Sequence, residues 1–370
     1  MSALRSLPLV LALAASPAFA ADSPAPLLAC LDAQFAALPM DPATDVGLSV
    51  AMLPMHDDWS WQGARGVADR EAGTPLTPEH GFRIASITKT FTAAAVLRLV
   101  EQGRLGLHDP IAKHLDADVV AVLESGGYDP QAIRLRHVLN HTSGMREHVT
   151  EDFLARHGDG SGYQSTAREQ VKLAMAAGAP FAAPGDEFHY SDTGYVLLGL
   201  VIERHTGKPL HEALRSLQAW EANGLAHSWF ETLEPARAPQ AHQYWQGRDT
   251  RPWHASFDLY GGGGIVAPPG DTAAFLRVLL KGGLFERPGS LKFMRTPGVT
   301  GAWNDYGAGL FNLEVDGETM IGHSGYWNTF VFLSPDDGVI FAGAVGEKTA
   351  LPYGPLLGAL RTAYRTCAPG

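Results

Sequence analysis

The chain has 370 residues, of which 45% are hydrophobic and 41 are glycine, so it can bury a large core in one domain or in two interleaved lobes. Its 39 acidic residues outnumber its 28 basic residues, and the formal net charge of −11 disfavours nucleic-acid binding. No internal repeat or low-complexity block is present.

The first 20 residues have the features of a cleaved secretory signal. Arg5 supplies one positive charge, an apolar run follows from Leu7 to Ala15, and Ala18-Phe19-Ala20 is a small-residue cleavage site. The apolar run is too short to span a bilayer, and no later segment is long and apolar enough to do so. We therefore expect a signal peptide at residues 1–20, a periplasmic or secreted mature chain at residues 21–370, and no stable membrane insertion.

The two cysteines lie near the ends of the mature chain, at Cys30 and Cys367. This placement suits one disulfide in an oxidising compartment. The alternative is that Leu27-Leu28-Ala29-Cys30 is a lipoprotein site, but three prolines and Asp22 separate this cysteine from the apolar run. We therefore expect the disulfide.

The early part of the chain predicts a β-hairpin followed by a helix. Val46–Met52 and Trp59–Val67 are apolar, strand-like runs separated by polar turn residues. From Ile87 to Val100 the apolar residues recur at helical spacing, and Gly103 is suited to end that helix. Ser86 then opens a helix that we expect to be mostly buried.

The rest of the chain predicts a helical region and then more strands. Residues 107–271 are helical and loop-rich, which indicates a helical lobe inserted in an α/β lobe. Three apolar, β-rich runs and a final helix follow, at Met320–Gly322, Thr329–Ser334, Val339–Val345 and Tyr353–Thr366. Strands at both ends with helices between them indicate an α/β (α+β) fold, in which distant segments form one antiparallel β-sheet flanked by helices. Such a sheet brings the two ends of the chain together, as the expected disulfide requires.

The pair Ser86 and Lys89 is the most informative pattern in the sequence. Residues three apart on a helix are neighbours, with Cβ atoms roughly 5 to 6 Å apart, so the Lys89 amine can lie beside the Ser86 hydroxyl. A hydroxyl needs an adjacent base to become a good nucleophile, and a lysine with a lowered pKa can serve. The match alone is weak, because Ser86 could be merely a helix cap and Lys89 a solvated residue of the first turn.

The pair has companions in a specific chain order. Tyr190-Ser191-Asp192 follows Pro184-Gly185, and His323-Ser324-Gly325 comes later. With these motifs the sequence resembles the penicillin-recognising serine hydrolases, in particular the class C β-lactamase-like branch that includes D-Ala-D-Ala carboxypeptidases, D-aminopeptidases and some esterases. The resemblance covers nearly the whole mature chain and includes four further segments: Leu105–Ile111, Ile133–Gly144, Tyr195–Glu203 and Gly261–Val266. It implies a β-lactamase/transpeptidase-like fold.

The resemblance also implies a role for each residue of the site. Ser86 is the acylated nucleophile, and Lys89 and Tyr190 share the proton transfers, with the principal base left open. The backbone N–H groups of Ser86 and Tyr326 stabilise the oxyanion of the tetrahedral intermediate. The residues implied in substrate binding are Asp192, His323, Ser324, Gly325 and Tyr326. The alternatives are that Tyr190 is a core tyrosine and that His323 is a structural turn residue.

Two other segments imitate these motifs. His205-Thr206-Gly207 matches the third motif, but it closes an apolar helical run, where Gly207 is better explained as a helix cap. Tyr326-Trp327-Asn328 matches a Tyr-x-Asn pattern, yet it follows the third motif instead of preceding it. We therefore assign the roles to Tyr190 and His323.

Two residues depart from the pattern of many β-lactamases of this fold. His323 stands where they carry lysine, and a neutral or partly charged histidine holds a substrate carboxylate less firmly. Asp192 stands where asparagine is usual, and an ionised aspartate can only accept hydrogen bonds. Asp192 would suit a substrate amine or hydroxyl, or it could pair with Lys89, raise the pKa of that lysine and favour Tyr190 as the base. Both departures weaken the expectation of β-lactam hydrolysis.

The sequence thus predicts an exported serine hydrolase that acts on a small-molecule or peptide substrate through an acyl-enzyme on Ser86. The leading hypothesis is a peptidase or amidase of the D-Ala-D-Ala carboxypeptidase or D-aminopeptidase type. The first alternative is a carboxylesterase, followed by a β-lactamase and by a catalytically silent binding protein. We expect no cofactor and no metal, because no histidine pair has ligand-like spacing together with a carboxylate. His137 and His141 come closest, and we interpret them as structural.

Overall fold

A computed structural model describes residues 24–39, 47–301 and 305–368, so the expected signal peptide at residues 1–20 lies outside the described residues. The helices are α1 (Ala25–Ala37), α2 (Thr88–Glu101), α3 (Ala117–Ser125), α4 (Leu135–Leu139), α5 (Glu151–Gly158), α6 (Ala167–Ala176), α7 (Asp192–Thr206), α8 (Leu210–Gln218), α9 (Pro269–Leu280), α10 (Pro288–Arg295) and α11 (Tyr353–Cys367). The strands are β1 (Leu48–Pro54), β2 (Trp61–Arg65), β3 (Val67–Asp69), β4 (Thr74–Pro75), β5 (Phe82–Arg83), β6 (Trp229–Phe230), β7 (Tyr244–Trp245), β8 (Arg248–Asp249), β9 (Ile265–Ala267), β10 (Phe311–Val315), β11 (Glu318–Gly325), β12 (Thr329–Ser334) and β13 (Val339–Val345).

The central sheet has six antiparallel strands in the order β10-β11-β12-β13-β1-β2. The expected early hairpin is confirmed, since β1 pairs with β2 from Leu48 opposite Arg65 to Met52 opposite Trp61. The expected union of distant segments is also confirmed, because β1 pairs on its other side with β13, with Val50 opposite Gly343. The fold is therefore a mixed α/β fold built on an antiparallel sheet.

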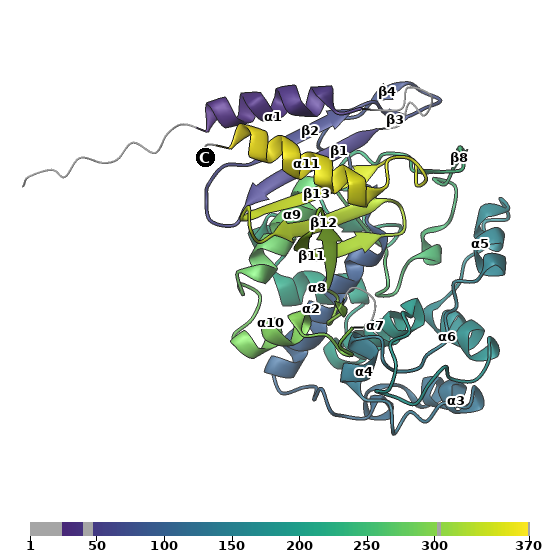
Figure 1. The fold of residues 1–370 in the computed structure, drawn as a ribbon. Coiled ribbons are helices and arrows are strands. Elements are labelled where there is room, and N and C mark those ends of the chain that lie inside the picture. The colour runs from purple at the N-terminus through teal and green to yellow at the C-terminus, as the bar shows by residue number, and fades with distance from the viewer. Residues whose placement is uncertain (1–23, 40–46, 302–304, 369–370) are drawn as a thin grey trace, which may run out of the picture.

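Both faces of this sheet are covered by helices, and the alternation of side chains along a strand explains why (Figure 1). On β13, Phe341 packs in a core with Leu31 of α1 and Leu357 of α11. Its neighbour Ile340 points to the opposite face, in the core that contains Phe275 of α9. Because both faces are buried, β13 is an apolar run without polar interruptions, as its sequence indicated.

The two ends of the described chain meet on one face of the sheet. Helices α1 and α11 lie side by side there (Figure 1). Cys30 of α1 and Cys367 of α11 form a disulfide, with their Cα atoms 5.6 Å apart. The expected bridge is therefore confirmed, and a cysteine whose sulfur is bridged cannot carry the thioether-linked lipid of a lipoprotein.

The stretch between residues 107 and 271 contains helices α3 to α8 together with the short strands β6 to β9. Helix α7 lies in the interior of this region, where it packs against α2. The strand order β5-β9-β6 forms a second, three-stranded sheet, so the chain segment just before α2 is tied to this region by hydrogen bonds. Within the described ranges, no helix combines the length and the apolar character that a membrane span needs.

Helix α2, which contains Lys89, runs through the centre of the molecule. The sequence from Thr88 to Glu101 is mostly Ala, Thr and large apolar residues, and all but two of its side chains are buried. A helix that is apolar on all sides has to lie inside the protein. The helix ends at Glu101, and Gly103 adopts a left-handed conformation with φ +70°. This outcome confirms the expected buried helix, preceded by a short 3₁₀ turn at Ala85–Ile87 that contains Ser86.

Replacing both bridged cysteines (Cys30→Ala with Cys367→Ala) is expected to lower the free energy of unfolding by about 2 to 5 kcal/mol, because the unfolded chain gains freedom when the link is removed. Urea denaturation of the double variant and of the wild-type protein, with and without a thiol reductant, measures this difference. Reduced wild-type protein should unfold like the double variant. Equal stabilities of the oxidised wild-type protein and the double variant would contradict the expectation.

Candidate active site

Ser86 lies in a strained turn that is held against the central sheet. The residue before it, Ala85, is buried and has φ +47°, a left-handed conformation that costs free energy for alanine. Gly325 of β11 passes so close to the turn that a Cβ atom there would lie 2.3 Å from the carbonyl oxygen of Ile84. The Thr329 hydroxyl of β12 donates a hydrogen bond to the same oxygen at 3.1 Å. The first residues of β12 and the end of β11 therefore fix the position of Ser86.

Lys89 lies one helical turn from Ser86 and is fully buried. Its ammonium group donates hydrogen bonds to Ser86 Oγ at 2.8 Å and to the carbonyl oxygen of Gly262 at 3.0 Å, and it forms an ion pair with Asp192. Burial lowers the pKa of Lys89, but the Asp192 carboxylate and Tyr190 outweigh that effect and hold the pKa above its usual value. Lys89 therefore keeps its proton at neutral pH.

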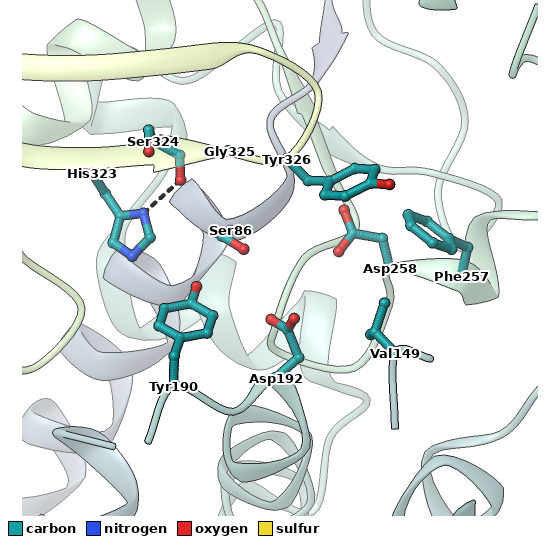
Figure 2. Close-up of a pocket in the computed structure, with 10 residues that line it drawn as sticks. All are labelled: Ser86, Val149, Tyr190, Asp192, Phe257, Asp258, His323, Ser324, Gly325 and Tyr326. Carbon is teal, nitrogen blue, oxygen red and sulfur yellow. Dashed lines mark hydrogen bonds between the residues drawn. The ribbon is translucent and has the colours of Figure 1, made fainter. Parts of the chain in front are cut away.

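Tyr190 lies beside both residues. The Lys89 Nζ atom is 5.0 Å from the centroid of its ring, and Figure 2 shows the Tyr190 hydroxyl pointing toward Ser86. The Tyr190 ring also stacks on His141, with centroids 4.2 Å apart, and the Nδ1 atom of His141 accepts a hydrogen bond from the Ser191 N–H at 3.1 Å. Burial raises the pKa of Tyr190 to about 12, although Lys89 opposes the rise. His141, which we expected to be structural, thus supports the ring of Tyr190.

Asp192 begins α7, and its carboxylate is committed to Lys89. Of the two arrangements that the sequence left open for Asp192, the structure has the pair with Lys89. The carboxylate of Glu147 accepts a hydrogen bond from the Asp192 N–H and so satisfies a donor at the helix N-terminus. Glycine at position 262 leaves room for this arrangement, since a Cβ atom there would lie 3.3 Å from Asp192 Oδ1.

His323 is a neutral imidazole in a buried position on β11. Its Nδ1 atom lies 2.7 Å from the Ser324 carbonyl oxygen, which can only accept, so Nδ1 carries the proton. Its Nε2 atom therefore accepts the hydrogen bond from the Tyr306 hydroxyl, at 3.1 Å. Burial, together with the charge of Lys89, lowers the pKa of His323 to about 3. His323 cannot supply a positive charge to a substrate carboxylate at neutral pH.

These side chains surround one pocket with a volume of about 250 Å³ (Figure 2). The residues that line it are Ser86, Val149, Tyr190, Asp192, Phe257, Asp258, His323, Ser324, Gly325 and Tyr326. Every site residue expected from the sequence lines the pocket except Lys89, which contacts Ser86 from the protein interior.

Sequence reasoning missed Val149, Phe257 and Asp258 in the pocket wall. No motif marks Val149. The signal for Asp258 was its position three residues before the glycine run that begins at Gly261, in an otherwise apolar and aromatic segment. Glu147, which holds the N-terminus of α7, was also missed, because its partner lies 45 residues away.

The two imitating motifs have structural roles. Gly207 ends α7 in a left-handed conformation with φ +67°, and its N–H donates to the Glu203 carbonyl oxygen at 2.8 Å, as a helix cap does. Asn328 lies in the turn between β11 and β12, and its side chain donates to the Ala350 carbonyl oxygen at 2.6 Å. In the part of the chain that the structure describes, no group of three or more His, Cys, Asp or Glu side chains is arranged to hold a metal ion.

Comparison with known proteins relates this pocket to a family of hydrolases. Residues 43–355 match the family model described as Beta-lactamase. The chain is similar to Esterase EstB of Burkholderia gladioli, with 34% identity over 225 residues that cover 56% of this chain and 55% of EstB. The chain therefore spans little more than half the length of that curated relative.

Solved structures share the whole fold. A D-stereospecific amidohydrolase from a Streptomyces species has a TM-score of 0.74 and 25% identity, over 94% of this chain and all of that chain. The D-amino acid amidase of Ochrobactrum anthropi SV3 has a TM-score of 0.72 and 25% identity, over 92% of this chain and 98% of that chain.

Replacing Asp192 by the asparagine that is usual in the family (Asp192→Asn) is expected to make Ser86 reactive at lower pH. The Asp192 carboxylate raises the pKa of both Lys89 and Tyr190, so its removal lowers the pKa of whichever group is the base. In a plot of the Ser86 modification rate against pH, the rising part should therefore move to lower pH by about one unit or more. The rate of Ser86 modification by a fluorophosphonate probe, measured from pH 6 to pH 10, provides this plot.

A matched control for this measurement is Asp336→Asn, which makes the same substitution in the exposed turn between β12 and β13. Its profile should coincide with that of the wild-type protein. A rising part that stays in place or moves to higher pH in Asp192→Asn would contradict the assigned effect of the carboxylate.

Proposed function

The chain belongs to the Beta-lactamase family and is a serine hydrolase, and from this membership we propose that it cleaves amide bonds of D-amino-acid substrates through an acyl-enzyme on Ser86. The observation that carries the proposal is the 2.8 Å hydrogen bond from Lys89 Nζ to Ser86 Oγ, with the Tyr190 hydroxyl on the pocket side of the same serine. A nucleophile with a cation and a phenol within reach has the groups that acyl transfer needs.

In the proposed first half-reaction, Tyr190 takes the proton of Ser86 as Oγ attacks the carbonyl carbon. The base is the phenolate form of Tyr190, which has lost its proton to solvent and is the minor form at neutral pH because the pKa of the phenol is about 12. Lys89 holds its own proton, and its charge stabilises this phenolate. The carbonyl π electrons move to oxygen, where the backbone N–H groups of Ser86 and Tyr326 stabilise the oxyanion. When the intermediate collapses, the carbon–nitrogen bond breaks and Tyr190 returns the proton to the departing amine.

The second half-reaction repeats these steps with water. Tyr190 takes a proton from a water molecule, which attacks the ester carbonyl of the acyl-enzyme. The bond to Ser86 Oγ then breaks, and Tyr190 gives the proton back to the serine. The product is a carboxylic acid, and Ser86, Lys89 and Tyr190 are restored to their starting states.

The charge of the pocket favours an amidase or aminopeptidase over a carboxypeptidase. D-Ala-D-Ala carboxypeptidase substrates and β-lactams present a carboxylate, which needs a positive partner. None of the ten described residues that line the pocket is lysine or arginine, His323 is neutral, and Lys89 is committed to Asp192. The similarity to a D-stereospecific amidohydrolase supports the same choice.

The second candidate function is that of a carboxylesterase. The specific observation in its favour is the 34% identity to EstB, a relative whose name describes an esterase. The same steps serve an ester, with an alcohol as the leaving group in place of the amine.

We also propose that the protein is exported. The leader-like sequence of the first 20 residues supports export. The Cys30–Cys367 disulfide supports it independently, because such bridges persist in oxidising compartments.

A fluorophosphonate probe is expected to form one covalent adduct, on Ser86, which mass spectrometry of the digested protein locates. Ser86→Ala should remove both the adduct and all turnover, because the Ser86 hydroxyl, which accepts the hydrogen bond from Lys89, is the proposed nucleophile. Circular dichroism should show that this variant is folded. Ser125→Ala, which changes an exposed serine on α3, is the matched control and should keep the adduct and the turnover. Folded wild-type protein without an adduct on Ser86 would refute the mechanism.

A substrate panel separates the two candidate functions. We expect hydrolysis of D-alanine p-nitroanilide, slower hydrolysis of its L enantiomer, and no measurable hydrolysis of a chromogenic cephalosporin, since the pocket lacks a partner for its carboxylate. The initial rate with each substrate, compared with that of Ser86→Ala, provides the measurement. Rapid cleavage of p-nitrophenyl esters with no cleavage of either anilide would favour the carboxylesterase.

A further inference from the structure

The carboxyl group of Asp258 faces the pocket without a protein partner. Asp258 lies in the loop before β9, and Figure 2 shows its carboxyl group pointing into the space between Ser86, Asp192 and the ring of Tyr326. No described residue donates a hydrogen bond to this group or forms an ion pair with it. Asp258 is half-buried, so its carboxyl group beside the expected nucleophile is accessible to a ligand in the pocket.

The position of this carboxyl group is set by the surrounding backbone. Phe257 and Leu259 on either side are buried, and the Asp258 N–H donates to the Ala255 carbonyl oxygen at 2.9 Å. A Cβ atom on Gly263 would lie 2.1 Å from Asp258 Oδ1, so the absence of a side chain there makes the space that the carboxyl group occupies. The packing therefore places Asp258 at the pocket in a defined orientation.

The charged groups around Asp258 are already paired with one another. Arg83 and Lys89 are the cations that act on its carboxyl group, and Asp192 and Glu231 are the anions. Arg83 pairs with Glu231, and Lys89 pairs with Asp192. Burial, followed by the effects of these charges, raises the pKa of Asp258 to about 7. A cation from outside the protein is the group that this environment lacks.

The walls next to Asp258 are apolar and aromatic. Phe257, Tyr326 and Val149 line that side of the pocket, and the Tyr326 ring is 6.0 Å from the ring of Phe257. Such a surface accommodates an apolar side chain, and aromatic faces also attract cations. One face of the Tyr326 ring already carries the Lys348 ammonium, with Nζ 3.2 Å from the ring centroid. A ligand with an ammonium group and an apolar side chain close together matches both features.

We propose that Asp258 binds the free ammonium group of the substrate, so that the enzyme selects acyl groups with an amine next to the scissile carbonyl and an apolar side chain against Phe257 and Tyr326. This inference rests on the proposed function, since it assumes that the pocket beside Ser86 holds the acyl part of the substrate. Asp258 would thus bind the substrate amine, which Asp192 cannot do because its carboxylate is paired with Lys89.

The test compares two ligands that differ only in the amine, D-phenylalanine amide and 3-phenylpropanamide, in the folded Ser86→Ala protein, where hydrolysis cannot interfere. Isothermal titration calorimetry at pH 7.5 is expected to show about 10- to 100-fold tighter binding of the amine-bearing ligand, the range for a hydrogen bond to a charged group. Adding Asp258→Asn should reduce this preference to about twofold or less. Adding Asp336→Asn, the exposed control, should leave the preference intact.

Equal affinity of Ser86→Ala for the two ligands would overturn the inference, and this comparison needs no substitution at position 258. A preference that survives Asp258→Asn would also overturn it. The proposed function fails separately, if the wild-type protein gives no fluorophosphonate adduct on Ser86. An adduct on Ser86 without an amine preference refutes only the role of Asp258, whereas an amine preference without an adduct refutes only the acyl-enzyme.

Discussion

A fully buried ammonium group must have its charge balanced, and the pocket is organised around this requirement. Lys89 projects from α2, and its partners come from the start of α7 and from the glycine run before β9. Loss of one partner from such a buried pair typically costs about 3 to 5 kcal/mol, because an uncompensated charge stays behind. The Lys89 ammonium group therefore joins three distant segments, through the ion pair with Asp192 and the hydrogen bond to Gly262. The ion pair at the same time sets the protonation state of the groups beside Ser86.

The central sheet supplies the other half of the site. The turn that holds Ser86 is pressed against Gly325 at the end of β11 and is hydrogen-bonded to Thr329 on β12. The nucleophile is thus fixed between the adjoining ends of β11 and β12, strands that are paired on both sides in the sheet, and the helix that contains its neighbouring cation. Strain at Ala85 persists because both sides of the turn are held in this way.

Much of this arrangement could be predicted from local patterns, and the rest depends on distances that a sequence does not show. The apolar runs predicted the sheet, and the spacing of Ser86 and Lys89 predicted their contact, because both follow from the periods of strands and helices. The neutral state of His323 depends on burial by remote elements, and the choice of Lys89 as the partner of Asp192 depends on packing across 103 residues. Asp258 belongs to no recognised motif, so only the folded chain shows that it meets the pocket.

The disulfide between Cys30 and Cys367 has a topological consequence. It joins residues 337 positions apart and closes almost the whole described chain into a covalent ring. A single cut by a protease in any loop between the two cysteines opens this ring but leaves one connected molecule. The cut leaves two new chain ends in the loop. The pairing of β1 with β13 in the sheet is unaffected, so the two pieces keep their positions relative to each other. A protein built in this way can survive nicking in surroundings where proteases are present.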